Sequence, residues 1–162
     1  MSVDPDTFRS VLGRFASGVT VITLCDNAGR DYGITVTAFA SLSLNPPLVL
    51  ACIDREASIH RLMNASPSSP PPFTVSILAA DQEPLARRFA ADVPDKFDGI
   101  GYSRGANGAA LLDDALAYLE CQNVRTIEAG DHTIFVGEVE AAVARSGRPL
   151  LYYRGGYAQL ER

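Results

Sequence analysis

The stretch that decides the fold lies between Gly33 and Pro47 and reads Gly-Ile-Thr-Val-Thr-Ala-Phe-Ala-Ser-Leu-Ser-Leu-Asn-Pro-Pro. Its hydroxyl side chains are separated by even numbers of residues, at Thr35, Thr37, Ser41 and Ser43. Because alternate side chains of a strand point to the same face, we expect these four hydroxyls to share one face of an extended segment. A face packed into a core would be apolar. The pattern therefore indicates either the solvent-facing side of an edge strand or a surface that binds a polar ligand.

Strand-like segments lie on both sides of this stretch. Runs rich in β-branched and apolar residues, bounded by turn-forming residues, occur at 19–24, 33–39, 48–53, 73–78, 116–127, 133–144 and 150–160. The first two are joined by a short turn, and we expect them to form a hairpin. Most links are short, without a regular alternation of strands and helices, which predicts antiparallel pairing. The expected fold class is mainly β, an antiparallel barrel with peripheral helices.

Three short helices are expected outside the barrel. Asp4 and Pro5 predict an N-cap and a first helical turn, followed by apolar residues at helical spacing and closed by Gly18. Asp54 is the predicted cap of a second helix, and Asp81 opens a third.

The composition is that of an ordinary globular protein. The chain has 162 residues, 47% apolar and 20% charged, which suffices for one hydrophobic core and predicts a single domain over 1–162. A net charge of −5 without a basic cluster argues against nucleic acid as a partner. No apolar run is long enough to cross a membrane. Three widely spaced cysteines fit free thiols, so we expect a cytoplasmic location. No metal site is expected, because no cysteines or histidines occur at ligand spacing.

Residues 92–110 are glycine-rich and irregular, and a connection of this length suggests a binding role. They include Gly-Tyr-Ser-Arg-Gly around Ser103, which has the spacing of the nucleophile elbow of serine hydrolases, with Asp113 or Asp131 and then His132 downstream. An elbow requires a buried strand before the serine, whereas the preceding residues are polar and broken. A serine hydrolase that uses Ser103 is therefore the weaker alternative to a surface loop.

The quoted stretch resembles the core signature of the flavin reductase-like domain. This is the family of short-chain NAD(P)H:flavin oxidoreductases that supply reduced flavin to two-component monooxygenases. The resemblance covers nearly the whole chain, from Phe-Ala-Ser-Gly-Val-Thr-Val-Ile-Thr at 15–23, through 111–121 and the Gly-Asp-His turn at 130–132, to Pro-Leu-Leu-Tyr-Tyr-Arg-Gly-Gly-Tyr at 149–157. Membership implies a split β-barrel of the FMN-binding type, a homodimer and a flavin held near the subunit interface.

The resemblance also implies roles for individual residues. The residues that would line the flavin ring and its ribityl chain lie in two segments: Thr35, Val36, Thr37, Ala38, Cys52, Ile53 and Asp54. Ser41 and Ser58 would bind the phosphate, and Ser58 lies near an expected helix N-terminus, where free backbone N–H groups favour an anion. His132 and Tyr157 would face the nicotinamide. Hydroxyls suit a ribityl chain and a phosphate because each both donates and accepts.

The implied activity is hydride transfer from NADH or NADPH to FMN or FAD, with the reduced flavin diffusing to a partner monooxygenase. The cofactors carry this chemistry and the protein only has to stack the rings and exclude water, which agrees with the absence of an acid–base constellation. The sequence leaves open which flavin and which nicotinamide are used, and whether the flavin is a bound group or a substrate. A flavin-binding carrier or sensor without turnover is the alternative.

The chain departs from the family pattern at three places. Asn45 stands where aspartate is more usual, and Ser76 where asparagine is. Residues 66–72, with four prolines and three serines, resemble an insertion and predict an exposed loop that could alter access to the adenosine end of a nucleotide.

Overall fold

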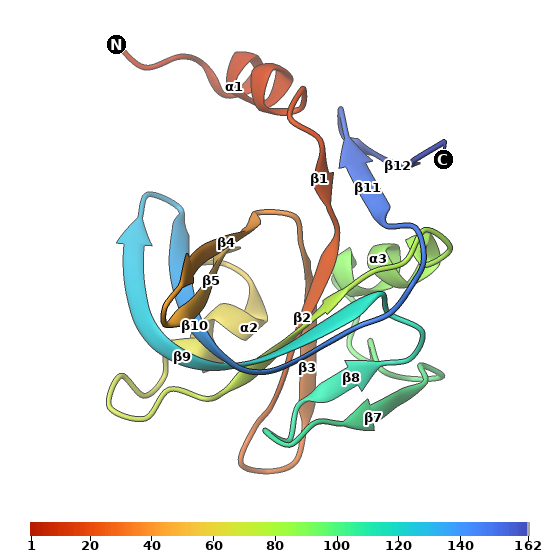
Figure 1. The fold of residues 1–162 in the computed structure, drawn as a ribbon. Coiled ribbons are helices and arrows are strands. Elements are labelled where there is room, and N and C mark those ends of the chain that lie inside the picture. The colour runs from red at the N-terminus through yellow and green to blue at the C-terminus, as the bar shows by residue number, and fades with distance from the viewer. Residues whose placement is uncertain (162) are drawn as a thin grey trace.

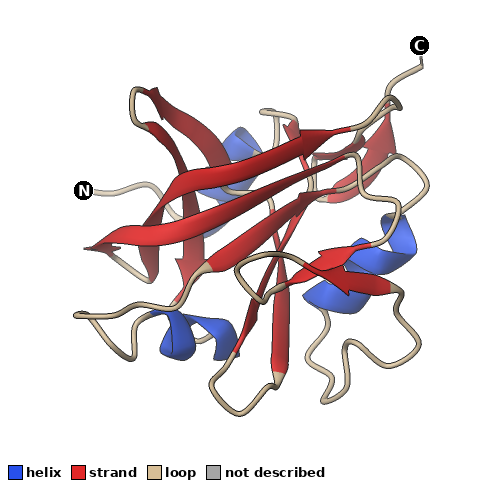
Figure 2. Cartoon of the chain, turned by 60° about the horizontal axis from the view of Figure 1, so that its bottom comes forward, coloured by secondary structure: helices blue, strands red, loops and turns tan. Residues whose placement is uncertain are grey.

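Strands form most of the protein, which the computed structural model describes over residues 1–161 (Figure 1). The helices lie at the periphery of the strands (Figure 2) and are α1 (Pro5–Leu12), α2 (Ser58–Met63) and α3 (Glu83–Ala90). The strands are β1 (Ser17–Gly18), β2 (Thr20–Cys25), β3 (Asp31–Val36), β4 (Phe39–Leu44), β5 (Pro47–Asp54), β6 (Phe73–Ile77), β7 (Tyr102–Arg104), β8 (Ala110–Leu112), β9 (Ala117–Ala129), β10 (His132–Ala144), β11 (Leu150–Tyr153) and β12 (Gly156–Gln159). The predicted mainly β class with few helices is confirmed.

A large antiparallel sheet has the strand order β3-β2-β6-β9-β10-β5-β4, accompanied by a three-stranded sheet β1-β11-β12 and the hairpin β7-β8. Its edge strands, β3 and β4, are consecutive in the chain and are joined only by Thr37 and Ala38. This link holds the Cα atoms of Val36 and Phe39 within about 11 Å of each other. The sheet is therefore curved enough for its two edges to approach at this point.

The decisive stretch does not form one strand. The expected strand at 33–39 ends at Val36, and β4 begins at Phe39 on the opposite edge of the sheet. The pairing of β4 with β5 also shifts between Ser41 and Ser43, which interrupts the period of two. The prediction that four hydroxyls share one strand face is therefore wrong, because a crossing and a register shift separate them.

The N-terminal helix is capped as predicted but is shorter. The Asp4 carboxylate accepts hydrogen bonds from the backbone N–H groups of Asp6 at 3.1 Å and Thr7 at 3.0 Å. The helix ends at Leu12, with Gly13 as its C-cap, and Gly18 lies within β1.

Three further expectations need correction. Asp54 does not cap α2, since its carboxylate accepts from the N–H of Glu56 at 2.8 Å and the N-cap position is Ala57. The run at 150–160 divides into β11 and β12, because Arg154 and Gly155 adopt positive φ in a tight turn. The irregular segment 92–110 includes β7 and leads into β8.

Two hydrophobic clusters fill the interior on opposite faces of β2. Ile22 and Leu24 belong to the cluster that packs against α2, whereas Val19 and Val21 belong to the cluster that packs against α3. Alternate residues around this strand thus face different clusters, which explains why β2 is buried without interruption from Thr20 to Leu24. The two helices are thereby fixed on either side of β3. Among residues 1–161, no helix has the length and hydrophobicity needed to cross a membrane.

Gly33 lets α3 pack directly on the backbone of β3. A Cβ atom at this position would lie 2.6 Å from Cε1 of Phe89 and 3.3 Å from Cζ of Phe97. The Phe97 ring also contacts Phe89 edge to face, with ring centroids 5.0 Å apart. This aromatic packing brings the loop after α3 beside the edge strand β3.

Candidate functional site

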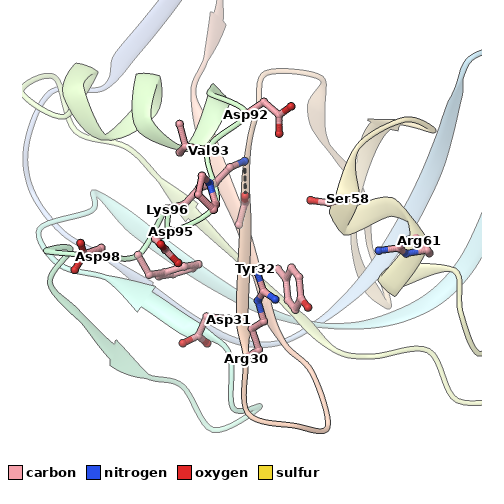
Figure 3. A pocket seen from close by; sticks show the side chains of 13 residues that line it. Arg30, Asp31, Tyr32, Ser58, Arg61, Asp92, Val93, Asp95, Lys96 and Asp98 are labelled. Carbon is pink, nitrogen blue, oxygen red and sulfur yellow. Dashed lines mark hydrogen bonds between the residues drawn. The ribbon is translucent and has the colours of Figure 1, made fainter.

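A wide pocket with a volume of about 1090 Å³ opens beside β3. Residues 30–33 form its floor, Ser58 and Arg61 of α2 form one wall, and the loop 92–98 after α3 forms the other (Figure 3). A pocket of this size accommodates an organic ligand as large as a nucleotide.

Arg88 fixes the loop wall of the pocket. Its guanidinium donates hydrogen bonds to the backbone carbonyls of Asp95 at 2.9 Å, Lys96 at 3.1 Å and Asp98 at 2.7 Å. Three carbonyls of an irregular loop thus share one rigid donor on the last turn of α3. The wall is consequently held in place before any ligand arrives.

Lys96 secures the same wall from within the loop. Its ammonium donates to the carbonyl of Gly33 at 3.2 Å and to that of Phe89 at 2.9 Å (Figure 3). Burial lowers the pKa of Lys96, and the nearby Asp92 carboxylate partly opposes this effect. The ammonium therefore ties the loop to both β3 and α3.

The opposite wall exposes polar groups. Ser58 is the first residue of α2, as the sequence analysis expected within the second helix, and its side chain is exposed. Arg61 lies one helical turn further on and shares the same wall. At the floor, the guanidinium carbon of Arg30 lies 5.3 Å from the ring centroid of Tyr32.

The segment expected to bind the flavin ring begins where the pocket floor ends. The Thr35 hydroxyl donates to the carbonyl of Ala86 in α3 at 2.6 Å, and Val36 is buried. The half-buried Thr37 and the exposed Ala38 form the link between the two edge strands. Thr35 thus anchors the segment to α3, and its backbone and the Thr37–Ala38 link face outward from the sheet edges.

The second predicted segment lies next to this link. The carbonyl of Ala38 accepts a hydrogen bond from the N–H of Cys52 at 2.9 Å. Cys52 is half-buried, and burial raises the pKa of its thiol. Ile53 points into the core, whereas Asp54 is exposed at the end of β5. The structure therefore brings the two predicted segments together.

Ser41 lies on the exposed edge strand β4, opposite Val49 of β5. Edge strands present backbone N–H and C=O groups that the sheet does not use, and both β3 and β4 are edges. Such donors and acceptors, together with the Ser41 and Ser58 hydroxyls, match the carbonyls, hydroxyls and phosphate of a flavin nucleotide. The residues present fit this group.

His132 lies at the start of β10, directly opposite Asp54. Gly130, with φ of +65°, forms the tight turn before it. The Nδ1 atom of His132 is 2.7 Å from the Asp131 carboxylate, and this contact lowers the pKa of Asp131. The imidazole thus stands at the end of the sheet that holds Cys52.

Tyr157 lies in β12 of the small sheet and not in the large sheet that contains His132. It faces Tyr152 across β11 and β12, its ring lies 5.0 Å from the Arg87 guanidinium carbon, and burial raises its pKa. The turn that carries His132 and the strand β12 that carries Tyr157 are on opposite sides of the protomer (Figure 1). The structure does not bring these two side chains together within one subunit.

The geometry does not support the serine hydrolase alternative. Ser103 lies in the middle of the short strand β7, opposite Leu111, and not at a turn from a strand into a helix. His132 belongs to the large sheet, on the other side of the protomer. A nucleophile elbow is therefore absent around Ser103.

Sequence reasoning missed most of the pocket, because its walls depend on Arg88 and Lys96, which carry no motif by themselves. The one feature of the sequence that pointed to the pocket is the irregular segment 92–110, because residues 92–98 form one of its walls. The two other basic residues, Arg30 and Arg61, gave no signal because each is an isolated charge in the sequence.

Comparisons with known proteins agree with this geometry. The profile of the family described as "Flavin reductase like domain" matches residues 12–161. A relative from Rhodococcus opacus, the "4-nitrophenol 4-monooxygenase/4-nitrocatechol 2-monooxygenase, reductase component", is 41% identical over 96% of this chain and 80% of its own length. The "NADH-dependent flavin reductase" of Rhodococcus sp is 40% identical over 98% of this chain and 88% of its own length.

Among solved structures, the Streptomyces globisporus C-1027 NADH:FAD oxidoreductase SgcE6, in complex with NAD and FAD fragments, superposes with a TM-score of 0.89 at 39% identity. The alignment covers 99% of this chain and 96% of that chain. The chain belongs to the flavin reductase-like domain family. The predicted class is thus confirmed: the protein is an oxidoreductase that works with a flavin and a nicotinamide nucleotide.

The structure predicts that Arg88→Gln loosens the pocket wall. Lys96 is the only lysine in the sequence, so endoproteinase Lys-C has one cleavage site, inside this wall. Loss of three charge-assisted hydrogen bonds should raise the rate of native-state cleavage at Lys96 by about tenfold or more. Arg87→Gln is the matched control, because Arg87 bonds Glu83 and not the loop. If the Arg88→Gln variant is cleaved at Lys96 at the same rate as the wild-type protein, Arg88 does not hold the loop wall.

Proposed function

We propose that the protein uses NADH to reduce a flavin that it binds as an exchangeable substrate, and that the reduced flavin serves a separate monooxygenase. The observation that carries the proposal is the position of the Thr35–Ala38 segment, which links the two sheet edges and continues directly from the open pocket. Relatives named as reductase components of monooxygenases support the partner class.

The proposed flavin site consists of the residues that the family resemblance indicated. The ring and ribityl chain contact Thr35, Val36, Thr37, Ala38, Cys52, Ile53 and Asp54. Because the Thr35 hydroxyl is already bonded to Ala86, and because Val36 and Ile53 are buried, these three residues contribute through their backbone. Ser41 and Ser58 bind the phosphate, each with an exposed side chain.

The protein's task in the reaction is to position two rings. When bound, the nicotinamide supplies a hydride to the flavin, and this transfer needs no protein nucleophile. The backbone of the Thr37–Ala38 link orients the flavin, and the half-buried Cys52 keeps water from one side of it. His132 and Tyr157 position the nicotinamide, the imidazole being oriented by Asp131.

We also propose a split-barrel arrangement within a single domain. The first support is the curvature of the large sheet, whose two edges are joined by the Thr37–Ala38 link. The second is the small sheet β1-β11-β12, whose strand β1 leads directly into β2 of the large sheet. The profile match over residues 12–161 is consistent with one domain. Three free thiols, at Cys25, Cys52 and Cys121, support a reducing, cytoplasmic environment.

A homodimer completes the proposed site. Helix α1 buries no residue in the protomer, and Phe8 and Phe15 are 57% and 81% exposed. It stands away from the sheet (Figure 1), so its apolar side faces solvent unless another subunit covers it. His132 and Tyr157 occupy opposite sides of one protomer, so a single nicotinamide reaches both only when a second subunit supplies one of them.

Sedimentation equilibrium checks the dimer. We expect the wild-type protein at micromolar concentration to have twice the mass of one chain, and Phe8→Asp to have the mass of one chain. Since α1 contributes nothing to the core of the protomer, the variant should retain its far-ultraviolet circular dichroism. A monomeric wild-type protein would overturn the proposal.

The test of function is the visible spectrum of the flavin-loaded protein under anaerobic conditions. Addition of NADH should bleach the absorption band of the oxidised flavin, because hydride transfer reduces the ring. The same experiment with NADPH in place of NADH measures which of the two nucleotides the protein prefers. A protein that binds flavin but is bleached by neither nucleotide would be a carrier or sensor instead.

Steady-state kinetics of His132→Ala test its role. If His132 positions the nicotinamide, the variant loses a contact common to ground and transition states, so KM for NADH should rise several-fold while kcat falls less. The Kd for flavin should barely change. A fall in kcat with loss of a step in the pH profile near the ordinary histidine pKa of about 6.5 would instead indicate proton donation. Wild-type kinetics would assign the residue to the turn alone.

A further inference from the structure

A second pocket, with a volume of about 320 Å³, lies between α1 and the turn that joins β11 to β12, at one end of the molecule (Figure 1). It is lined by Arg9, Ser10, Gly13, Arg14, Arg154 and Gly155. Three of these residues are arginines and none is acidic, although the whole chain carries a net charge of −5. The pocket therefore concentrates positive charge on a protein that is acidic as a whole.

Helix α1 turns its polar face toward this pocket. The end of the helix is held there because the backbone N–H of Arg154 donates a hydrogen bond to the carbonyl of Gly13 at 2.9 Å. The apolar residues of the helix are exposed and lie on its opposite face: Phe8, Val11 and Leu12. The contact proposed for a second subunit uses that apolar face and leaves the polar face of α1 available to a ligand.

The arginines of the pocket do not cap the helix. Arginine near a helix C-terminus often donates to the last backbone carbonyls. In α1 the carbonyls of Arg9, Val11 and Leu12 already accept hydrogen bonds from backbone N–H groups of the following residues, at 2.8 to 3.1 Å. In the part of the chain that the structure describes, the side chains of Arg14 and Arg154 make no hydrogen bond and no ion pair. Their guanidinium groups therefore have donors to offer a ligand.

Arg9 contributes a third guanidinium at the edge of the pocket. It donates to the Asp6 carboxylate at 3.1 Å, and both side chains are largely exposed. An exposed ion pair of this kind contributes little to stability. Arg9 can therefore exchange Asp6 for a ligand with a higher negative charge.

The backbone at Arg154 supports a role for its side chain. Arg154 has a φ of +50° and Gly155 a φ of +76°, so both residues of the β11–β12 turn adopt the left-handed conformation. Asparagine and glycine adopt this conformation most readily, and other residues do so at a cost in backbone energy. Residues held in such conformations cluster at ligand-binding and active sites. The geometry of the turn alone does not account for an arginine here.

The donors of the pocket define the chemistry of its ligand. A guanidinium binds a phosphate group through two parallel hydrogen bonds, and several guanidinium groups around one cavity favour an anion with more than one negative charge. The Ser10 hydroxyl adds a further donor. A cavity of about 320 Å³ has much less room than the one of about 1090 Å³ beside β3. It therefore suits a small phosphate-bearing anion.

We propose that this pocket is a binding site for phosphate or diphosphate, held between the guanidinium groups of Arg14 and Arg154. Arg9 and Ser10 complete its wall. The anion bridges α1 and the β11–β12 turn and thereby restrains the helix. The site shares no residue with the pocket beside β3 or with the Thr35–Ala38 segment. It binds its ligand independently of the flavin and takes no part in the hydride transfer.

Isothermal titration calorimetry with inorganic diphosphate, on the flavin-free protein at constant ionic strength, measures the affinity of the site. The variant Arg14→Gln/Arg154→Asn removes both guanidinium groups, and asparagine tolerates the positive φ of residue 154. We expect its Kd for diphosphate to rise at least tenfold. Arg125→Gln/Arg148→Gln is the matched control, because it removes two exposed arginines outside the pocket. Its Kd should equal that of the wild type.

Hydrogen exchange locates the bound anion. In the wild-type protein, diphosphate should slow amide exchange in peptides that contain Gly13 or Arg154, because the anion joins these two segments. Exchange in peptides covering 92–98, in the wall of the other pocket, should not change. The double variant should show no slowing in either region, and a far-ultraviolet circular dichroism spectrum equal to that of the wild type shows that it is folded.

Several results would overturn the proposal. Equal Kd values of the double variant and the wild type, or slowed exchange at 92–98 alone, would place the diphosphate outside this pocket. A wild-type protein that binds no diphosphate would remove the site altogether. A several-fold higher KM for NADH in the double variant would assign the pocket to the diphosphate of the nicotinamide nucleotide. The calorimetry and exchange experiments contain neither flavin nor NADH, so they test the site whatever the outcome for the proposed function.

Discussion

The close packing of two aromatic rings on the bare backbone of Gly33 is the contact on which the site depends. Any side chain there would meet Phe89 within 2.6 Å, so α3 could not approach β3 at its present distance. That approach allows the Thr35 hydroxyl to reach the carbonyl of Ala86 and the Lys96 ammonium to reach the carbonyl of Gly33. One missing Cβ therefore sets the position of a helix, an edge strand and a loop together.

The functional region is built at the edges of the sheet, which most β proteins cover or shorten. Here the two edges are brought together by the short link of Thr37 and Ala38, and their unused backbone groups become available to a ligand. This arrangement agrees with the absence of charged side chains between Thr35 and Ala38. In a reaction carried by two cofactors, the main task of the protein is to orient their rings, and backbone groups of a rigid sheet are suited to this task.

The sequence predicted the long strands β9 and β10, the Asp4 cap and a helix containing Ser58, because each is encoded by local propensity and periodicity. It did not predict the crossing at Thr37 and Ala38, because no glycine or proline marks the point where one strand pattern stops and another starts. The family resemblance indicated the two segments that we propose to bind the flavin, whereas the residue pattern alone also allowed a solvent-facing edge strand.

The pocket was beyond sequence reasoning for a different reason. Its walls meet only after α2 and α3 have packed on opposite faces of β2, so Ser58 and Lys96 become neighbours of β3 through tertiary contacts. The separation of His132 and Tyr157 is likewise a property of topology. Motifs that match a family in order along the chain say nothing about which of them meet within one subunit.

The pinned loop wall also bears on how long a ligand stays. Arg88 and Lys96 already donate hydrogen bonds to backbone carbonyls in the absence of a ligand. The loop wall therefore forms few new hydrogen bonds when a nucleotide binds and breaks few when it dissociates. The residence time is then governed by the contacts that the open pocket offers, without a slow opening step. A rigid, open pocket of this kind suits an enzyme that releases its product in every turnover.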